Sequence, residues 1–469
     1  MSGLYTRFVA GVVFPLQERL KHHSTVADLS ALEASQWWER SRILDLQLQR
    51  LRALLVHAGA RVPYYRELFA RCGFDPAAVR SVADLARLPL LDKPTIRAHT
   101  DALKAEGAVG LARFNTGGSS GEPLIFYIGR ERVSRDVAAK WRATRWWGVD
   151  IGDPEVVVWG SPIELKAQDR MRGLRDALMR TELLSAFEMS PERLDHFVAR
   201  IRARRPAMLF GYPSSLSMIA AHAAARGVRL DDLGVKVAFV TSERLYPEQR
   251  AAIERAFACP VANGYGGRDA GFIAHQCPAG SLHITAEDIV LETVDAEGRA
   301  VPAGQPGEIV VTHLATGEFP FIRYRTGDVG VLSDAACACG RGLPVLAEVQ
   351  GRTTDFVVAA DGTVMHGLAL VYVLRDLPGV QHFRIVQESL ALTRIELVAT
   401  PAQDAARDAA VVAAFRRRLG AGVEVRIEPV EAIARERSGK YRYVQSRVAA
   451  GPALAASEPQ NSHSTLNPS

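Results

Sequence analysis

The sequence predicts an α/β protein, with a large N-terminal domain of parallel strands and helices and a small α+β domain after it. Short apolar strands alternate with helical patterns between residues 155 and 265, at a period of roughly thirty residues that is typical of βαβ units. From about residue 283 to residue 345 short strands with Gly and Pro turns predict a β-rich subdomain. A chain of 469 residues also exceeds the size at which one core keeps growing, so at least two domains are expected.

The composition is that of an ordinary globular protein, with 48% hydrophobic and 23% charged residues. The net charge of +5 is mildly basic, but the arginines are scattered along the chain and are not interleaved with aromatic residues. This pattern argues against nucleic acid as the principal partner, whereas ATP or another polyanionic ligand fits the charge equally well.

Cysteine usage and hydropathy predict a cytoplasmic protein. Five cysteines at uneven spacing do not form a disulfide framework, so a reducing compartment is the simpler assumption. The apolar run from Phe8 to Phe14 is short, is cut by Pro15 and lacks the cleavage site of a signal peptide. No apolar run approaches the length that spans a bilayer. We therefore expect a soluble protein without a transmembrane segment, and a loose membrane association of the N-terminus stays open.

The stretch from about residue 30 to residue 72 predicts helices, because six leucines recur at spacings that build a broad apolar face: Leu44, Leu46, Leu48, Leu51, Leu54 and Leu55. Trp37 and Trp38 are interpreted as buried anchors of this layer rather than as a binding surface. Asp92 is a candidate cap for the next helix, and a further helix is expected from Glu131 to Trp147.

The alternating region predicts the edge at which a ligand would bind. Its strands are expected at residues 155–160, 207–210 and 235–240, and its helices around 194–201, from Ser214 or Ser215 onward, and at 247–257. Ligands of parallel sheets collect beyond the carboxyl ends of the strands. The side chains that follow those strands are therefore candidates, among them Tyr212, Ser242, Glu243 and the run from Tyr265 to Asp269.

Residues 351–450 predict a small α+β domain and residues 451–469 a disordered tail, which leaves residues 1–350 for the large domain. An Asp361-Gly362 hairpin turn joins two short strands at its start. The remaining elements are expected to be strands at 383–386 and 395–398, a helix at 404–419 and a last strand at 423–427.

The run from Phe114 to Pro123 is the first candidate site, since it holds three glycines among hydroxyl and amide side chains. Glycine has no Cβ, so such a loop lets an anion approach the backbone and predicts a phosphate cradle. A surface turn is the ordinary alternative. The apolar run from Leu124 to Ile128 predicts a strand, so the loop is expected to enter a hairpin. It ends in Glu122-Pro123 and lacks the Lys-Ser or Lys-Thr pair of a Walker-type P-loop.

Four further motifs follow this loop in a fixed order: Tyr265-Gly266-Gly267-Arg268-Asp269, Arg323-Tyr324-Arg325-Thr326-Gly327-Asp328, Gly351-Arg352-Thr353-Thr354-Asp355 and Ser438-Gly439-Lys440. Each is weak alone, because Thr-Gly-Asp commonly forms a turn and Ser-Gly-Lys a solvated loop. Their succession resembles the adenylate-forming enzymes, in particular the phenylacetate-CoA ligases and the capsule-biosynthesis proteins similar to them. The resemblance covers the chain from about Leu51 to Val444.

This resemblance implies an AMP-forming ligase that binds ATP and Mg²⁺ and joins a carboxylic acid to coenzyme A. A large AMP-binding domain would adenylate the acid, and a small mobile lid domain would rotate about Asp355 to admit the thiol. Family association alone suggests an aryl or arylacetic acid. Transfer to a carrier protein, or to an amine or hydroxyl in polysaccharide or natural-product biosynthesis, stays open. A nucleotide-binding protein that has lost catalysis is a further alternative. A homodimer is also possible from the sequence.

The resemblance also implies the nucleotide-binding residues. Asp328 would accept hydrogen bonds from the ribose hydroxyls, a task that suits an ionised carboxylate, and Arg352 would support the ribose. The adenine pocket would be lined by Ser242, Glu243, Tyr265 and Gly266. The β- and γ-phosphates would be held by the glycine loop, namely by Thr116, Gly117, Gly118, Ser119, Ser120 and Gly121.

Three residues would act on the reacting groups: Lys440, Asp269 and Arg325. Lys440 would bridge the carboxylate and the α-phosphate as a cationic donor. Asp269 stands where many adenylate-forming enzymes have a glutamate that helps coordinate magnesium, and the shorter carboxylate would reach the ion directly or through water. Glu122 stands where relatives often have Lys or Thr, so a cation near the phosphates is missing. Both departures lower the turnover that we expect.

A metal site is the last candidate, in the β-rich subdomain. Cys337 and Cys339 form a tight thiol pair, and Cys277 and His283 lie upstream. Three sulfurs and one imidazole would complete a tetrahedral structural zinc site with no open position for catalysis. The resemblance to the ligase branch extends to these positions. His275 could replace His283 as the fourth ligand, and unliganded thiols are the alternative interpretation.

Overall fold

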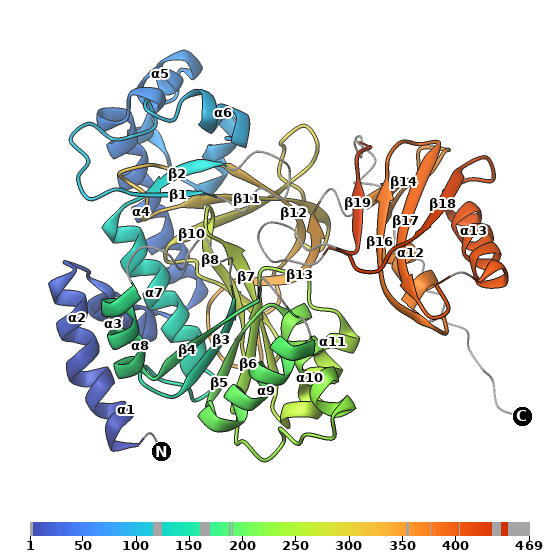
Figure 1. The fold of residues 1–469 in the computed structure, drawn as a ribbon. Coiled ribbons are helices and arrows are strands. Elements are labelled where there is room, and N and C mark those ends of the chain that lie inside the picture. The colour runs from blue at the N-terminus through green and yellow to red at the C-terminus, as the bar shows by residue number, and fades with distance from the viewer. Residues whose placement is uncertain are drawn as a thin grey trace, which may run out of the picture.

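The structure, a computed structural model, describes residues 3–115, 124–159, 169–186, 189, 191–352, 356–375, 377–402, 404–433 and 442–448. A large body carries an eleven-stranded sheet flanked by helices, and a small body at the C-terminal end carries a four-stranded sheet (Figure 1). The predicted fold class, an α/β domain followed by a small α+β domain, is confirmed.

One half of the large sheet is parallel and the other half is antiparallel. The order of its strands is β10-β11-β12-β13-β9-β8-β7-β6-β5-β3-β4. The parallel half consists of β3 (Glu155–Trp159), β4 (Thr181–Ser185), β5 (Met208–Gly211), β6 (Val237–Thr241) and β7 (Val261–Gly267). The antiparallel half consists of β8 (Gly271–Gln276), β9 (Leu282–Ile284), β10 (Ile289–Val294), β11 (Pro306–His313), β12 (Tyr324–Ser333) and β13 (Val345–Arg352). Because β7 pairs with both β6 and β8, it joins the two halves.

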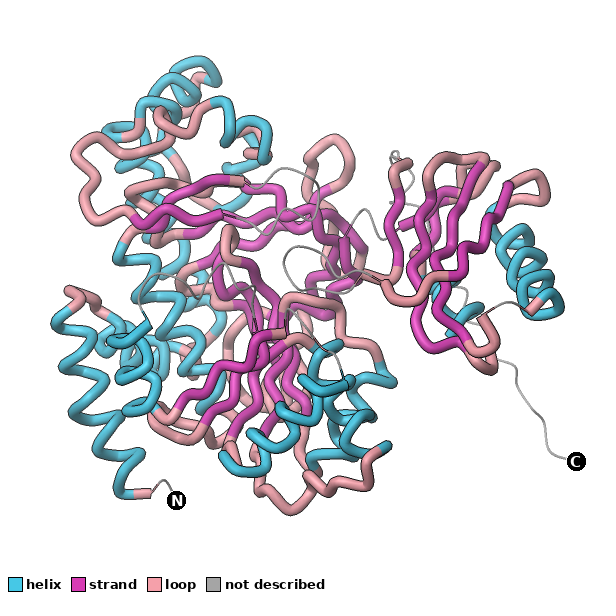
Figure 2. The backbone as a smooth tube through the Cα atoms, viewed as in Figure 1, coloured by secondary structure: helices cyan, strands magenta, loops and turns pink. Residues whose placement is uncertain are grey.

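Helices cover both faces of the parallel half, as Figure 2 shows. They are α7 (Arg130–Arg145), α8 (Asp169–Met179), α9 (Pro191–Arg204), α10 (Pro213–Ala225) and α11 (Pro247–Phe257). Val156 and Val158 of β3 pack in a core with α9, α10 and α11, whereas Val157 packs in a core on the α7 face. Burial on both faces explains why these strands are continuous apolar runs in the sequence.

The N-terminal helices form a layer at the edge of the large domain (Figure 1). They are α1 (Leu4–Phe8), the π-helical η1 (Val9–Val13), α2 (Phe14–Leu20), α3 (Thr25–Ser35), α4 (Arg40–Arg61) and α5 (Pro63–Cys72). The short η2 (Pro76–Ala78), η3 (Val82–Arg87) and α6 (Lys93–Ala98) follow. Asp92 caps α6 as predicted, since its side chain accepts a hydrogen bond from the N–H of Thr95 at 2.9 Å.

Two predictions about this layer are wrong. The buried face of α4 begins at Ile43, whereas Leu44 is 41% exposed, because leucines surround this helix and only one face meets the sheet. Trp37 is 55% exposed rather than buried, and its ring lies against the guanidinium of Arg341, at 4.7 Å. Trp38 is half-buried and packs on the main core.

The hairpin at the glycine loop is confirmed. Strands β1 (Ala112–Asn115) and β2 (Ile125–Ile128) pair antiparallel, and Asn115 is the register partner of Ile125. The residues between them, 116–123, lie outside the described residues.

The small domain begins with the hairpin β14 (Phe356–Val358) and β15 (Val364–His366), joined as predicted by a turn in which Gly362 has a φ of +86°. Its other elements are α12 (Leu368–Arg375), β16 (Val380–Gln387), β17 (Leu392–Ala399), α13 (Ala405–Leu419), β18 (Glu424–Pro429) and β19 (Val444–Ser446). The prediction that the strand near residue 425 is the last one is wrong, because β19 pairs with β16. Three residues are too few to show an alternating pattern in the sequence.

Candidate functional site

Two of the motifs meet in a hydrogen bond between the ends of two distant segments. The hydroxyl of Tyr265, on β7, donates to Oδ2 of Asp328 at 2.9 Å and lies 3.4 Å from Oγ1 of Thr326. Asp328 is the register partner of Arg352 on β13, so the backbone of a third motif reaches the same place. These motifs therefore converge where the parallel half of the sheet meets the antiparallel half.

The phenol of Tyr265 is kept protonated. Burial raises its pKa well above the ordinary value, and the negative charge of Asp328 adds to this effect. Tyr265 is therefore the donor in this pair at neutral pH, and the bond fixes the orientation of the Asp328 carboxylate.

The loop after β6 holds Ser242 and Glu243 in a defined conformation. Ser242 has a φ of +70°, in the left-handed region that residues other than glycine seldom enter. Oε2 of Glu243 accepts a hydrogen bond from the N–H of Ser214 at 3.2 Å, in the first turn of α10. A carboxylate at this position satisfies a helix-end donor and opposes the positive end of the helix dipole. Because α10 begins at Pro213, the predicted start at Ser214 or Ser215 is late by one or two residues.

The side chain of Asp269 is oriented by its neighbours. The hydroxyl of Tyr324 donates to its Oδ2 at 2.6 Å, and the N–H of Ala270 donates to its Oδ1 at 3.1 Å. Tyr324 is fully buried, so this donor is held rigidly. Each carboxylate oxygen has more than one lone pair, so a half-buried carboxylate held in this way can still bind a divalent cation.

Arg325, the remaining described residue with a predicted catalytic role, lies in an ion pair. Its guanidinium donates to both carboxylate oxygens of Glu308 on β11, with Nε at 3.0 Å from Oε1 and 3.1 Å from Oε2. Hydrogen bonds to Glu308 raise the pKa of Arg325 above its ordinary value. The prediction for Arg325 stays a prediction, and in this conformation its charge is matched by Glu308.

Several predicted site residues lie outside the described residues, namely Thr116, Gly117, Gly118, Ser119, Ser120 and Gly121 of the glycine loop, Asp355 and Lys440. For Arg352, the structure describes the backbone, which belongs to β13. At the start of the glycine loop, the carbonyl of Asn115 lies 3.4 Å from Nη1 of Arg268, which belongs to the same motif as Tyr265.

A buried group on α7 supports this motif and was not predicted. Nη2 of Arg132 donates to the carbonyl of Arg268 at 2.8 Å. Oδ1 of Asp136 accepts from the N–H of Phe272 at 3.2 Å and lies 3.4 Å from Nε2 of His313. Burial alone would raise the pKa of Asp136, but His313 and Arg132 outweigh it and lower this pKa. The signal in the sequence was a pair of opposite charges four residues apart, at the start of a helix that follows the glycine loop.

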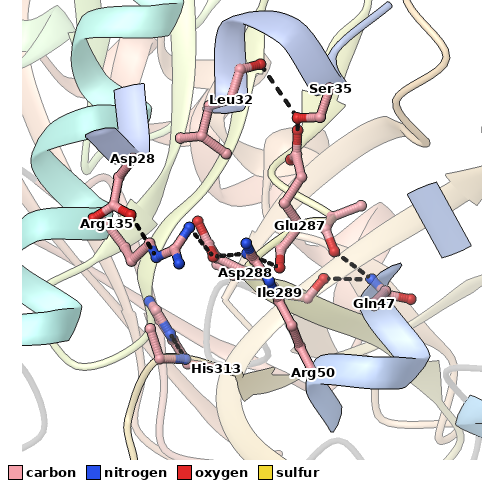
Figure 3. Close-up of polar contacts among 12 residues, drawn as sticks. Asp28, Leu32, Ser35, Gln47, Arg50, Arg135, Glu287, Asp288, Ile289 and His313 are labelled. Carbon is pink, nitrogen blue, oxygen red and sulfur yellow. Dashed lines mark hydrogen bonds and ion pairs between the residues drawn. The ribbon is translucent and has the colours of Figure 1, made fainter. Parts of the chain in front are cut away.

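A second buried network joins the N-terminal helices to the turn between β9 and β10 (Figure 3). Nη1 of Arg50 lies 2.6 Å from Oδ1 of Asp288, and Arg135 lies between Asp288 at 3.7 Å and Asp28 at 3.3 Å. Burial raises the pKa of Asp288, and the two arginines partly offset this shift. Glu287 accepts from the hydroxyl of Ser35 at 2.6 Å. Each charge has a partner from another element, so this network fixes the helical layer on the sheet.

The predicted metal ligands come together. The ligand atoms of Cys277, His283, Cys337 and Cys339 all lie within 4.8 Å of one another. Nε2 of His283 lies 3.1 Å from Sγ of Cys339, and Sγ of Cys277 lies 3.7 Å from Sγ of Cys337. Among the residues that the structure describes, this is the group with metal-ligand geometry. The alternative ligand His275 is not part of it, since its ring stacks on Phe272.

The electrostatics of His283 and Cys337 suit a metal, whereas burial raises the pKa of the Cys277 thiol to about 11 when no cation is present. Burial lowers the pKa of His283 to about 4, so its imidazole is neutral at neutral pH. Its Nδ1 lies 3.3 Å from the carbonyl of Leu343, which leaves Nε2 for a metal. Burial would raise the pKa of Cys337, but hydrogen bonds from Ser281 and from the N–H of Cys339 lower it to about 7. Three sulfurs and one nitrogen are the donor set of a closed structural zinc site.

The two domains touch through an aromatic pair. The rings of Tyr246 and Tyr443 pack edge to face, with centroids 5.4 Å apart. Tyr246 is the N-cap of α11 and lies three residues after Glu243, while Tyr443 packs on Phe383 in the small domain. The contact therefore joins the small domain to the loop that follows β6.

Comparisons with known proteins find similarity to AMP-binding enzymes and to CapK. A model of the AMP-binding enzyme family matches residues 183–316, and a model of the CapK C-terminal domain matches residues 357–447. Protein CapK from Staphylococcus aureus is 24% identical over 376 residues, which cover 78% of this chain and 79% of CapK. Phenylacetate-coenzyme A ligase from Thermus thermophilus is 27% identical over 357 residues, 74% of this chain and 78% of the ligase.

Solved structures share the fold. A 2-hydroxyisobutyryl-CoA ligase in the postadenylation state, in complex with R3-HIB-AMP, superimposes with a TM-score of 0.70 at 22% identity, over 88% of this chain and 91% of the ligase. In the thioesterification state, in complex with 2-HIB-AMP and CoA, the same ligase gives a TM-score of 0.59 over 88% and 91%. The shared fold is a large mixed sheet with a small C-terminal domain.

Proposed function

The chain belongs to the adenylate-forming superfamily of AMP-binding enzymes, and from this premise we propose that it activates a carboxylic acid with ATP and transfers the acyl group to coenzyme A. The observation that carries the proposal is the hydrogen bond from Tyr265 to Asp328. It sets an aromatic ring beside an oriented carboxylate, which is what recognition of a base and a ribose requires. Ser242, Glu243 and Gly266 would complete the adenine pocket, and Arg352 would support the ribose.

In the first step, a carboxylate oxygen of the acid would form a bond to the α-phosphorus of ATP, and the bond to pyrophosphate would break. Lys440 would stabilise the charge that develops there, and the glycine loop from Thr116 to Gly121 would hold the β- and γ-phosphates. Asp269 would hold Mg²⁺, which neutralises phosphate charge. The donors that orient Asp269 support this role, since they leave lone pairs for the ion.

In the second step, the sulfur of coenzyme A would form a bond to the acyl carbon, its proton would pass to solvent, and AMP would leave. Rotation of the small domain about Asp355 would remove Lys440 and admit the thiol. The contact between Tyr246 and Tyr443 supports this proposal, because it joins the small domain to the loop that follows β6, which holds Ser242 and Glu243. It would belong to one of the two positions that the small domain takes during the reaction.

The acid is proposed to be an aryl or arylacetic acid. Trp159 and Tyr212 stack with centroids 4.4 Å apart at the carboxyl ends of β3 and β5, and Phe210 stacks on Phe239 at 5.9 Å. An aromatic lining at this edge of the sheet would suit a flat apolar substrate. Tyr212 and Phe239 are buried, which is also what core residues would show.

The Cys277, His283, Cys337 and Cys339 cluster is proposed to bind a structural zinc ion. Such an ion would tie the turn after β8 to the loop before β13, and it has no open position for a substrate. Arg341 of this loop stacks on the rings of Trp37 and Trp146, with centroid distances of 4.7 and 4.5 Å, so a fixed loop also anchors the end of α3.

A second candidate function is adenylation followed by transfer to an amine or hydroxyl, as in a polysaccharide, or to a carrier-protein thiol. The match of the small domain to the CapK C-terminal domain favours this alternative, because rotation of the small domain would admit the acceptor in the proposed mechanism. The adenylating step and its residues are the same in both.

The test is product analysis with a panel of aryl, arylacetic and fatty acids, MgATP, and either coenzyme A or no thiol. We expect acid-dependent release of pyrophosphate and AMP, and an acyl-CoA with an aryl or arylacetic acid. An acid that is converted to its acyl-adenylate but forms no thioester when coenzyme A is present would favour the second function. Binding of ATP without pyrophosphate release for any acid would contradict adenylation.

A further inference from the structure

A row of exposed apolar side chains runs along the N-terminal helices and has no role in the proposed reaction. It consists of Leu4, Phe8, Val12, Leu16 and Leu20, and we call it the N-terminal stripe. These side chains are 86, 53, 52, 57 and 75% exposed, in that order. The opposite face of the same helices is buried, at Thr6, Val9, Phe14 and Glu18. Apolar residues scattered singly on a surface are ordinary, whereas these five lie in one row along one side of a helix, so the row is a candidate interaction site.

The π-helical turn aligns this row. The backbone is helical from α1 through η1 to α2, and the residues that join the three segments, Val9 and Phe14, have right-handed helical dihedrals. On an α-helix, residues four positions apart point in directions that differ by about 40° around the helix axis. The hydrogen bonds of η1 span five residues, so each of its residues turns the chain by a smaller angle, and part of this rotation is cancelled. The stripe therefore keeps to one side of a helix about 25 Å long.

The charges around the stripe are positive. Arg7 and Arg19 adjoin Phe8 and Leu20 in the chain and are exposed. The acid in this segment is Glu18, which is 3% exposed and faces inward, where it accepts from the hydroxyl of Thr25 at 2.5 Å and lies 3.1 Å from Nδ1 of His23. The first 27 residues of the sequence contain no other Asp or Glu. The exposed face is thus apolar with a cationic border.

We propose that the N-terminal stripe binds the surface of a membrane that contains anionic lipids. An amphipathic helix with an apolar face and arginines beside it lies in the interface plane, with its apolar side chains among the acyl chains and its cations at the headgroups. The helix lies at the edge of the large domain, on the side away from the small domain (Figure 1), so a surface bound there leaves the small domain free to move. No helix among the described residues is long and apolar enough to cross a bilayer.

A second copy of the chain fits the stripe less well. A single row of five side chains covers about 250 Å², taking the 25 Å length and a helix width of about 10 Å, whereas a stable interface buries about 800 Å² on each partner. Two copies packed through the stripe would also bring Arg7 and Arg19 near their equivalents, which repel one another, while an anionic surface attracts them.

The test is flotation of the full-length protein with vesicles of phosphatidylcholine alone and with vesicles that also contain phosphatidylglycerol. We expect binding to the anionic vesicles and a loss of at least about tenfold in partition for the double variant Phe8→Ser, Leu16→Ser. The matched control is Val109→Ser, Leu390→Ser, which removes two exposed apolar side chains elsewhere, 77 and 45% exposed, and is expected to bind like the unaltered protein.

A second comparison tests the charges. The double variant Arg7→Gln, Arg19→Gln is compared with a control double variant, Arg255→Gln, Arg417→Gln, which removes two exposed arginines outside the stripe. We expect weaker anionic-vesicle binding for the first pair alone, and the thermal unfolding profile shows that each variant is folded. Equal binding of the stripe variant and the unaltered protein would overturn the proposal. The absence of vesicle binding by the unaltered protein would also overturn the proposal. If light scattering then showed a dimer that depends on the stripe, the face would be assigned to a second copy of the chain.

Discussion

The hydroxyl of Tyr265 lies 2.9 Å from Oδ2 of Asp328, although 63 residues separate them in the sequence. Tyr265 belongs to the last parallel strand, β7, and Asp328 to β12 in the antiparallel half of the sheet. The pair therefore exists only when both halves are assembled. Two short motifs, each weak alone, thus come together at the proposed nucleotide-binding site.

The Asp328→Asn variant is expected to raise the KM for ATP by roughly 10- to 100-fold, because charge-assisted hydrogen bonds to the ribose hydroxyls are lost. The measurement is pyrophosphate release as a function of ATP and of 2′-deoxy-ATP concentration. The unaltered enzyme should prefer ATP, and the variant should discriminate less. The control is Asp334→Asn, which changes an exposed aspartate directly after the end of β12. An unchanged ribose preference in the Asp328 variant would contradict the assignment.

The buried pair of Asp136 and His313 predicts an acid-side loss of stability. The folded-state pKa of Asp136 is lowered below its ordinary value of 3.8. Its contribution to the free energy of unfolding is therefore fully present above about pH 4 and is lost as the pH falls through the folded-state pKa. The Asp136→Asn variant should show a shallower fall in unfolding free energy below pH 4, measured by urea unfolding. Identical slopes for the variant and the unaltered protein would exclude this role.

The metal cluster predicts one tightly bound zinc ion per chain. Metal analysis of the purified protein should find it, and the Cys339→Ser variant should lose it and unfold roughly 5 °C lower or more. Cys72→Ser is the matched control, since Cys72 is an exposed free cysteine outside the cluster. A full zinc content in the Cys339 variant, or none in the unaltered protein, would argue for unliganded thiols.

The contact between Tyr246 and Tyr443 predicts a specific effect on one half-reaction. Tyr443 follows the predicted catalytic Lys440 by three residues, and its ring packs on the loop that follows the proposed adenine pocket. An aromatic pair contributes about 0.5–1.5 kcal/mol, so Tyr246→Phe should be nearly neutral and Tyr246→Ala should slow adenylation roughly 2- to 10-fold. Thioester formation from added acyl-adenylate should be less affected. Equal slowing of both steps would indicate a general loss of structure.

The sequence allowed β3, β5 and β6 of the parallel half to be predicted, because each is a continuous apolar run, whereas β4 and β7 were not predicted. It did not allow the side of α4 that meets the core to be predicted, since leucines occur around the helix and Leu44 differs from Leu51 only by its tertiary contacts. The pair of Asp136 and His313 could not be predicted either. These residues are 177 positions apart, and only the fold brings them together.

The surroundings of Arg325 could not be predicted from the sequence, whereas those of Cys339 could. The ion pair of Arg325 with Glu308 depends on the register between β11 and β12, which is shifted by an irregularity near Val310. No local pattern reveals such a shift. The candidate metal ligands could be predicted because closely spaced cysteines with a histidine carry their chemistry in the residue types themselves.

We propose that this chain forms an acyl-adenylate and that Lys440 stabilises the charge that develops at the α-phosphate. Acid-dependent exchange of labelled pyrophosphate into ATP tests it most directly, with Lys440→Ala beside the unaltered enzyme. We predict exchange with the preferred acid, a loss of at least about a hundredfold in the variant, and thioester formation by that variant from preformed acyl-adenylate and coenzyme A. Exchange that persists in Lys440→Ala, or no exchange with any acid by an enzyme that binds ATP, would contradict the account.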